Sequence, residues 1–194
     1  INWTSTHDVP RLSLRGTSAP VVISNAVICG FDDGKVTAYD LTDGSLLWET
    51  MLTPPGGRTE IEKVSDIDAP LVIYGNEVYA GSYQGALAAL AIESGNIIWL
   101  TEASLYAGMD VDDDVVFASE ANGTIRALSR FTGREVWKKE TLLHRYPTAP
   151  AIIGDAIVVG DLEGYLHWLN KEDGEMLQRA SIGSDKITSS PLVI

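Results

Sequence analysis

The sequence predicts an all-β chain made of four similar units, because one phrase is written four times. The phrase is a short alternating strand, a turn with a glycine and a second strand. It begins at Ala38 and returns at Ala89, Ala127 and, in altered form, His167. The turn glycines recur about every forty residues, the length of one four-stranded propeller blade, and no long stretch has helical periodicity. We therefore predict part of a β-propeller with four-stranded antiparallel blades.

Each copy of the phrase carries a glycine and, in three copies, a tryptophan four residues later. The glycines suit a backbone with positive φ, which other residues adopt only at a cost. We interpret the tryptophans as wedges that pack between neighbouring blades and donate their N–H to a nearby acceptor. Packing explains them better than a cofactor cage, because such large side chains are usually buried. The glycines are Gly44, Gly95, Gly133 and Gly174, and the tryptophans are Trp48, Trp99 and Trp137, with Gln178 at the fourth position.

The blades are expected at residues 19–50, 69–101, 107–140 and 149–181. An Ala-Pro pair opens the first, second and fourth of them, and proline suits the start of a strand, where its missing N–H costs no ladder bond. The third blade has Met109-Asp110 at that place. We interpret residues 1–18 as the end of a preceding blade, with Trp3 at its wedge position, followed by a loop. Pro191 would begin a fifth unit.

Four blades with a partial blade at each end do not close a ring. A propeller needs its last sheet to pack on its first. We therefore expect the chain to be about half of a ring, which pairs with the rest of the ring or associates with itself through its apolar end faces and strand edges.

Charge argues against nucleic acid as a partner, and hydropathy argues against a membrane-spanning segment. The chain has 27 Asp and Glu residues against 14 Lys and Arg, a net charge of −13. Such a surface repels a phosphate backbone, so nucleic acid is not expected as a partner. No run of about eighteen apolar residues occurs, so no membrane span is predicted. The single cysteine, Cys29, lies in an apolar strand and is interpreted as an inert core thiol.

Two loops depart from the repeat, each just before the first strand of a blade. Residues 8–17 place apolar and basic side chains together, where a connecting loop is normally polar. Residues 52–67 contain about ten extra residues, with a rigid Pro-Pro pair and a flexible Gly-Gly pair that project the loop. By the repeat, both loops emerge on the same face of adjacent blades. They would bring together Leu12, Leu14, Arg15, Asp66 and Asp68 as a small apolar patch with charges of both signs.

Two explanations of this patch stay open on the residues alone. In one, Arg15 pairs with Asp66 or Asp68 and ties the two loops together. In the other, the patch binds another protein, since leucines beside an arginine are typical of interface centres. The two are compatible, because a self-paired patch can still be an interface.

No catalytic or metal site is predicted. The histidines, His7, His144 and His167, lie in different blades without a metal-ligand spacing. The pair His144-Arg145, in the loop before the fourth blade, is the strongest outlier, whereas His167 is interpreted as a strand-face residue. The acidic run 110–114 lacks the glycine and glutamate of a calcium loop and is interpreted as a solvated turn between strands.

The phrase ALxxxTGxxxW resembles the repeat of the pyrroloquinoline-quinone (PQQ) type propellers. Dehydrogenases of that group hold their quinone with a vicinal cysteine pair, a calcium site and a catalytic aspartate. This chain has one cysteine. The resemblance therefore covers the scaffold and not the cofactor pocket, and no cofactor is expected.

Longer strings resemble the BamB family, eight-bladed propeller lipoproteins of the bacterial outer-membrane β-barrel assembly (BAM) machinery. They occur in the family's order and spacing and are more specific than the repeat phrase. The strings are LSLRG at 12–16, TEI at 59–61, SDID at 65–68, LLHR at 142–145 and VGDLEGYLHW at 159–168.

The resemblance implies about half of an eight-bladed ring and a non-enzymatic scaffold on the periplasmic side of the outer membrane, with a lipid anchor that this chain lacks. In that family the two irregular loops contact a periplasmic POTRA domain of the pore-forming subunit BamA. Carried over by position, Leu12, Leu14, Arg15, Asp66 and Asp68 would be the docking residues. Other BAM members would be reached through BamA, and unfolded outer-membrane proteins are candidate partners at strand edges.

Two other functions stay open. One is a fragment of a PQQ-type quinoprotein oxidoreductase. The other is a ligand-binding propeller module that takes a carbohydrate or peptide at the ring mouth near His144.

Overall fold

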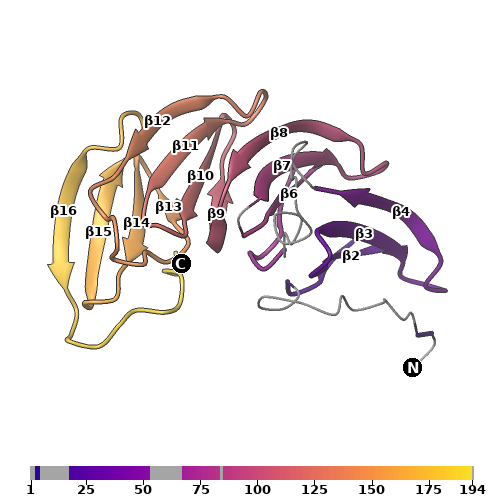
Figure 1. Ribbon diagram of the computed structural model, residues 1–194, viewed down its shortest axis with the longest axis horizontal. Helices are drawn as coiled ribbons and strands as arrows, with labels where there is room; N and C mark the ends of the chain where they lie inside the picture. The colour runs from indigo at the N-terminus through magenta and orange to yellow at the C-terminus, as the bar shows by residue number, and fades with distance from the viewer. Residues whose placement is uncertain (1–2, 5–17, 53–66, 84, 194) are drawn as a thin grey trace, which may run out of the picture. The chain divides into compact units, whose positions relative to one another are not determined.

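Every described strand belongs to one of four antiparallel sheets, each with four strands in sequence order. The computed structural model describes residues 3–4, 18–52, 67–83 and 85–193, and Figure 1 shows the sheets as successive groups of arrows. The predicted fold class, all-β with four-stranded antiparallel sheets, is confirmed.

The sheets fall into two compact units, Ile1–Leu105 and Tyr106–Ile194. The first unit holds β1 (Val21–Ile23), β2 (Ala26–Gly30), β3 (Lys35–Asp40) and β4 (Leu46–Met51), then β5 (Val72–Tyr74), β6 (Glu77–Gly81), β7 (Gly85–Ala91) and β8 (Ile97–Ala103). The second holds β9 (Leu105–Val111, whose first residue falls in the first unit), β10 (Val115–Glu120), β11 (Ile125–Ser129) and β12 (Glu135–Lys139), then β13 (Ala151–Ile153), β14 (Ala156–Gly160), β15 (Tyr165–Asn170) and β16 (Met176–Ser181).

The first strand of the third sheet is longer than its counterparts. β9 has seven residues, whereas β1, β5 and β13 have three each. The three short strands each follow a proline, which has no N–H to donate to a ladder. Met109-Asp110 stands at that place in the third sheet, so pairing continues through it.

The interpretation of residues 110–114 as one solvated turn is wrong in part. Asp110 and Val111 belong to β9, and only residues 112–114 form the turn. The reason is a long-range bond: the Asp110 carboxylate accepts the backbone N–H of Ile152 in β13 at 2.9 Å. An acid at this position satisfies a donor on the open edge of the next sheet.

The tryptophan of one repeat packs on the turn glycine of the next. A Cβ added to Gly95 would lie within 3.0 Å of two ring atoms of Trp48. The Trp48 indole N–H donates to the carbonyl oxygen of Ile92, three residues before that glycine, at 2.9 Å. The glycine thus makes room for the indole, and the turn supplies its acceptor.

Trp137 and Trp3 make the same kind of contact. Trp137 packs on Gly174 and donates to Lys171 O at 2.8 Å, and Trp3 packs on Gly44 and donates to Leu41 O at 2.9 Å. In each case the acceptor lies three residues before the glycine. The four turn glycines all have positive φ: 73° at Gly44, 68° at Gly95, 66° at Gly133 and 72° at Gly174.

Each unit has a hydrophobic core between its two sheets. In the first unit the core joins β2, β3 and β4 to β6 and β7, and in the second it joins β10, β11 and β12 to β14 and β15. The first cluster includes Ile28, Val36, Ala38, Trp48, Val78, Ala80, Ala88 and Leu90. The second includes Phe117, Ile125, Ala127, Trp137, Ile157, Val159 and Leu169.

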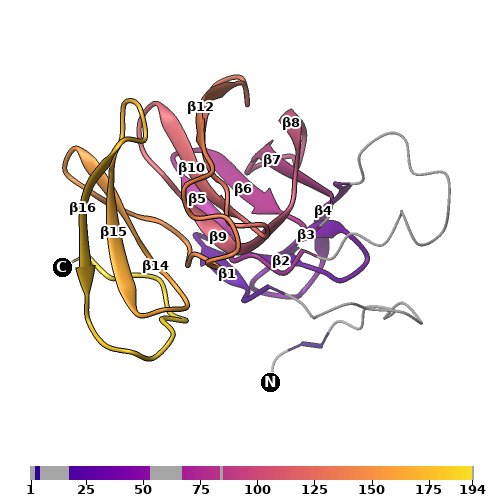
Figure 2. The ribbon, with the colours of Figure 1, turned by 60° about the vertical axis from the view of Figure 1, so that its left-hand side comes forward.

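After β16 the chain folds back beside β14 and β15, as the yellow segment in Figure 2 shows. The N–H of Ile182 donates to Gly164 O and the N–H of Ile187 donates to Asp161 O, both at 2.9 Å. Residues 182–193 form no strand. Across the described residues, no helix has the length and apolar character needed to cross a bilayer.

We expect Gly95→Ala to lower the free energy of unfolding by about 2–5 kcal/mol. A Cβ at φ 68° costs about 1–2 kcal/mol in backbone strain, and its overlap with the Trp48 ring adds about 1–3 kcal/mol. Gly75→Ala is the matched control, because Gly75 has φ 58° but nothing within 4 Å of a new Cβ. Urea denaturation measures both variants, and equal losses would refute the tryptophan contact as a constraint on position 95.

Candidate functional site

Four of the predicted docking residues, Leu12, Leu14, Arg15 and Asp66, lie outside the described residues. Asp68 is described and is half-buried. The structure does describe the points at which the two irregular loops end, Ser18 and Ile67.

Gly30, the last residue of β2, brings these two loop ends together. The Gly30 N–H donates to Ser18 Oγ at 3.1 Å, and the Ser18 N–H donates to Gly30 O at 3.3 Å. On the other side, the Ile67 N–H donates to Phe31 O at 3.1 Å. A Cβ on Gly30 would lie 2.5 Å from Ile67 Cγ2 and 2.8 Å from Ser18 Oγ, so only glycine allows both neighbours.

The second unit repeats this arrangement around Gly160. Thr148 lies twelve residues before Gly160, as Ser18 lies twelve before Gly30. The Gly160 N–H donates to Thr148 Oγ1 at 3.0 Å and the Thr148 N–H to Gly160 O at 2.9 Å. A Cβ on Gly160 would lie 2.5 Å from Ile187 Cγ2, so Ile187 takes the place of Ile67.

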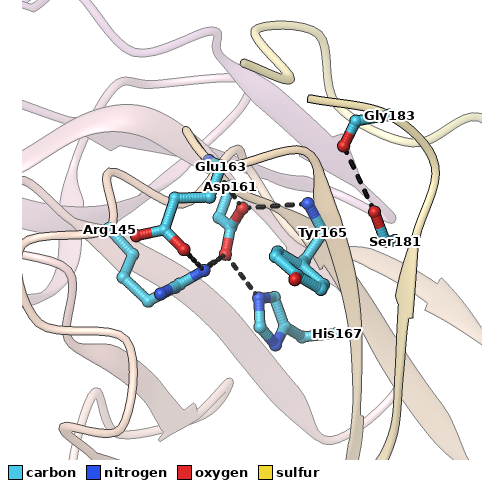
Figure 3. A network of polar contacts seen from close by, with 7 residues as sticks. All are labelled: Arg145, Asp161, Glu163, Tyr165, His167, Ser181 and Gly183. Carbon is cyan, nitrogen blue, oxygen red and sulfur yellow. Dashed lines mark hydrogen bonds and ion pairs between the residues drawn. The ribbon is translucent and has the colours of Figure 1, made fainter. Parts of the chain in front are cut away.

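Arg145 is three residues before Thr148, the position that Arg15 has before Ser18. Its Nε and Nη2 lie 2.7 and 2.6 Å from Asp161 Oδ2, and Nη2 lies 2.9 Å from Glu163 Oε2. Figure 3 shows the guanidinium held between the two carboxylates. The loop arginine of the second unit is therefore neutralised within the chain.

The Asp161 carboxylate is fully buried, and protein donors occupy both of its oxygens. Oδ1 accepts the backbone N–H of Glu163 at 2.9 Å and of Tyr165 at 3.0 Å, while Oδ2 lies 2.7 Å from His167 Nε2 as well as beside Arg145 (Figure 3). Burial raises the pKa of Asp161, but the bonds from His167, the Tyr165 N–H and Arg145 outweigh it, so the pKa lies below its usual 3.8. Because the ionised carboxylate only accepts, His167 Nε2 carries a proton.

This network fixes the loop before β13. The Leu162 N–H donates to Arg145 O at 3.0 Å, and the His144 N–H donates to Asn122 O at 2.9 Å. His144 and Tyr146 have positive φ of 61° and 48°, which is strained backbone for these side chains. Since protein donors fill the Asp161 oxygens, the network supports a strained loop and does not supply a general base.

Sequence reasoning singled out His144-Arg145 and His167 but missed Asp161, which links Arg145 to His167. A signal was present in the preceding sheet. Glu120 lies six residues before Arg126, as Asp161 lies six before His167, and Arg126 Nη1 is 2.8 Å from Glu120 Oε1. An acid therefore pairs with a base six residues later, across the same hairpin, in both the third and the fourth sheet.

No group of three or more His, Cys, Asp or Glu side chains in the described part of the chain is placed to hold a metal ion. In the acidic run, the Asp112 carboxylate accepts the N–H groups of Asp114 at 3.1 Å and Val115 at 2.8 Å, and it pairs with Lys171. The half-buried thiol of Cys29 has a pKa raised by burial, which disfavours the reactive thiolate.

We expect Asp161→Asn to lower the free energy of unfolding at pH 7 by about 2–4 kcal/mol, because it removes the anion that faces Arg145 and buried His167. The folded-state pKa of Asp161 is lowered, so its ionised form stabilises the fold above the usual pKa of 3.8, and this stabilisation is lost as the pH falls through the lower folded-state value. Urea denaturation should therefore show a smaller difference between wild type and variant at about pH 3.

The control is Glu163→Gln, which removes an exposed partner of the same arginine and should cost less than about 1 kcal/mol. A difference for Asp161→Asn that stays constant between the two pH values would contradict the role given to its charge.

Comparison with known proteins connects this geometry to a family. A family model described as outer membrane protein assembly factor BamB matches residues 1–139. The chain is 41% identical over 191 residues to the outer membrane protein assembly factor BamB of Kangiella koreensis, covering 98% of this chain and 49% of that protein. The crystal structure of BamB from Moraxella catarrhalis is similar with a TM-score of 0.88 and 31% identity, over 100% of this chain and 58% of that one.

A quinohemoprotein alcohol dehydrogenase from Pseudomonas putida also aligns, with a TM-score of 0.73 over 96% of this chain and 36% of that one. Its identity is 15%, so it shows the fold alone. The chain spans about half the length of the BamB relatives that it matches. The repeated sheets, the recognised strings and these matches agree, and the chain belongs to the family of the outer membrane protein assembly factor BamB.

Proposed function

We propose that this chain is part of a non-enzymatic scaffold for assembling outer-membrane β-barrel proteins, and that its two irregular loops dock a periplasmic POTRA domain of BamA. One observation supports this docking surface: Ser18 and Ile67, the residues at which the two loops end, both lie against Gly30. Asp66 directly precedes Ile67 and Arg15 is three residues before Ser18. A chain of three residues reaches at most about 11 Å, so the proposal needs only short distances from these two loop ends to bring the charges together.

The residues on these loops have the chemistry of an interface centre. Leu12 and Leu14 would supply apolar area, Arg15 a planar donor group, and Asp66 and Asp68 carboxylates. Arginine with apolar neighbours is enriched in the buried centres of protein interfaces, and paired charges fix the orientation of the partner.

Comparison of the two units favours docking over a purely internal role for Arg15. In the second unit, buried Asp161 neutralises Arg145. Phe31 takes the position of Asp161 in the first unit, Asp33 takes that of Glu163, and the buried acid there is Asp32, one residue after Phe31. An internal tie of Arg15 would therefore differ from that of Arg145 and would use acids such as Asp32, Asp33, Asp66 or Asp68.

The same proposal places the protein on the periplasmic side of the outer membrane, held there by a lipid anchor in its full-length form. BamA would connect it to the other members of the assembly machinery. Unfolded outer-membrane proteins would be secondary partners that add strands to its exposed edges. The proposal assigns no catalytic residue and no cofactor, and this chain, with its single cysteine, contains no vicinal cysteine pair of the quinoprotein type.

We expect Arg15→Ala and Asp66→Ala each to weaken binding of the BamA POTRA region by about 30-fold or more, because removing one member of a partly buried charge pair costs about 2 kcal/mol or more. Isothermal titration of the protein with the POTRA region measures this effect. Arg134→Ala and Glu172→Ala, two exposed charges on turns between strands, are the matched controls and should leave the affinity unchanged.

The purely internal explanation gives the opposite pattern. If Arg15 served only to tie the loops, both loop variants would lower the free energy of unfolding while the POTRA affinity stayed the same. Unchanged affinity in both variants would eliminate this surface as the docking site.

A further inference from the structure

A cavity of about 440 Å³ opens in the second unit, at the place that corresponds to the proposed docking surface of the first. Thr148 and Ile187, the residues that flank Gly160, form part of its wall. Its lining residues also include Tyr106, Tyr146, Pro147, Leu162 and Lys186. Its volume falls in the range of about 300–1,000 Å³ that is typical of ligand pockets.

We propose that this cavity binds an extended segment of a protein partner, in which a large apolar side chain is followed by a carboxylate. The apolar side chain would lie between the two tyrosines, and the carboxylate would pair with Lys186. This site uses none of the residues assigned to POTRA docking, so it does not depend on that assignment.

Three of the lining side chains expose apolar surface to solvent. Tyr146 is 64% exposed, Tyr106 is 48% exposed and Leu162 is 37% exposed. Tyrosine rings next to a proline and aliphatic side chains are typical of surfaces that hold peptides, because they offer large, rigid area at little entropic cost. An apolar side chain of a partner would remove this area from water.

The cavity is built in advance of binding. Tyr146 follows Arg145, which Asp161 and Glu163 hold, and keeps a positive φ of 48°. Leu162, another lining residue, donates its N–H to Arg145 O, and Ile187 donates its N–H to Asp161 O. The buried network thus fixes three walls at once, which reduces the entropy lost on binding. Strained backbone held by such support is a common property of binding sites.

The charge of the cavity selects the partner. Lys186 is the one charged side chain among its lining residues, and it forms no ion pair with the described part of the chain. The chain as a whole carries a net charge of −13, so an isolated cation at an apolar cavity favours a segment with a local acid. In the first unit the residue before the equivalent isoleucine is Asp66, so the charge at this one position differs in sign between the two units.

The test uses three blocked tetrapeptides, acetyl-GFDG-amide, acetyl-GADG-amide and acetyl-GFNG-amide, titrated into the ¹⁵N-labelled protein and followed by NMR. We expect the first peptide to shift the amide signals of Tyr106, Tyr146 and Lys186. Loss of the aromatic ring in the second peptide should weaken binding about tenfold, and loss of the charge in the third should weaken it about threefold.

Variants distinguish binding in this cavity from nonspecific binding of the peptide elsewhere on the surface. Tyr146→Ser should weaken the first peptide about tenfold, and Lys186→Met should abolish the preference for aspartate over asparagine. Phe131→Ser is the matched control. Phe131 is also an exposed aromatic ring (57%), lies outside the cavity and has the Arg130 guanidinium over one face. All three side chains are on the surface, and the NMR spectrum of each variant reports its fold directly.

Equal binding of the three peptides, an undiminished response in Tyr146→Ser, or no response at millimolar peptide would each overturn the proposal. Titration with the POTRA region keeps the two sites apart, since Tyr146→Ser should leave that affinity unchanged.

Discussion

The structure depends on one repeated contact, a tryptophan of one repeat seated on the turn glycine of the next. Trp48 on Gly95 and Trp137 on Gly174 each bury an indole ring and satisfy its N–H with a carbonyl three residues before the glycine. The glycine serves twice, because its positive φ forms the turn and its missing Cβ admits the ring. Within each unit, the first blade can therefore join the second through a contact between residues only about one repeat apart in the sequence.

A second glycine position decides where function can reside. Gly30 and Gly160 are the last residues of the second strands of their sheets. Gly30 lies against Ser18 and Ile67, and Gly160 lies against Thr148 and Ile187. The contact with glycine fixes only the ends of the loops that lead to these residues and by itself sets neither their length nor their composition. Irregular loops are thus held at set places on a regular framework, which is how scaffolds position binding residues.

The arrangements around Gly30 and Gly160 have the same backbone geometry but different neighbouring side chains. In the second unit, Arg145 is committed to buried Asp161, and the rigid loop that results shapes an aromatic cavity. In the first unit, Phe31 replaces the buried acid, and the arginine at the matching position is Arg15. The buried acid of this segment is thus shifted by one residue, from the position of Asp161 in the second unit to Asp32 in the first.

The sequence by itself determined the fold class, the blade repeat and the family, because period, turn glycines and recognisable strings are local features of the chain. It also identified both irregular loops, and the patch of Leu12, Leu14, Arg15, Asp66 and Asp68 stays a prediction from the sequence. Only the tertiary structure decided that Asp110 is bound to Ile152 and that Asp161 joins Arg145 to His167. These partners lie on different strands and loops, and a local pattern cannot specify which donor reaches a given carboxylate until the sheets have packed.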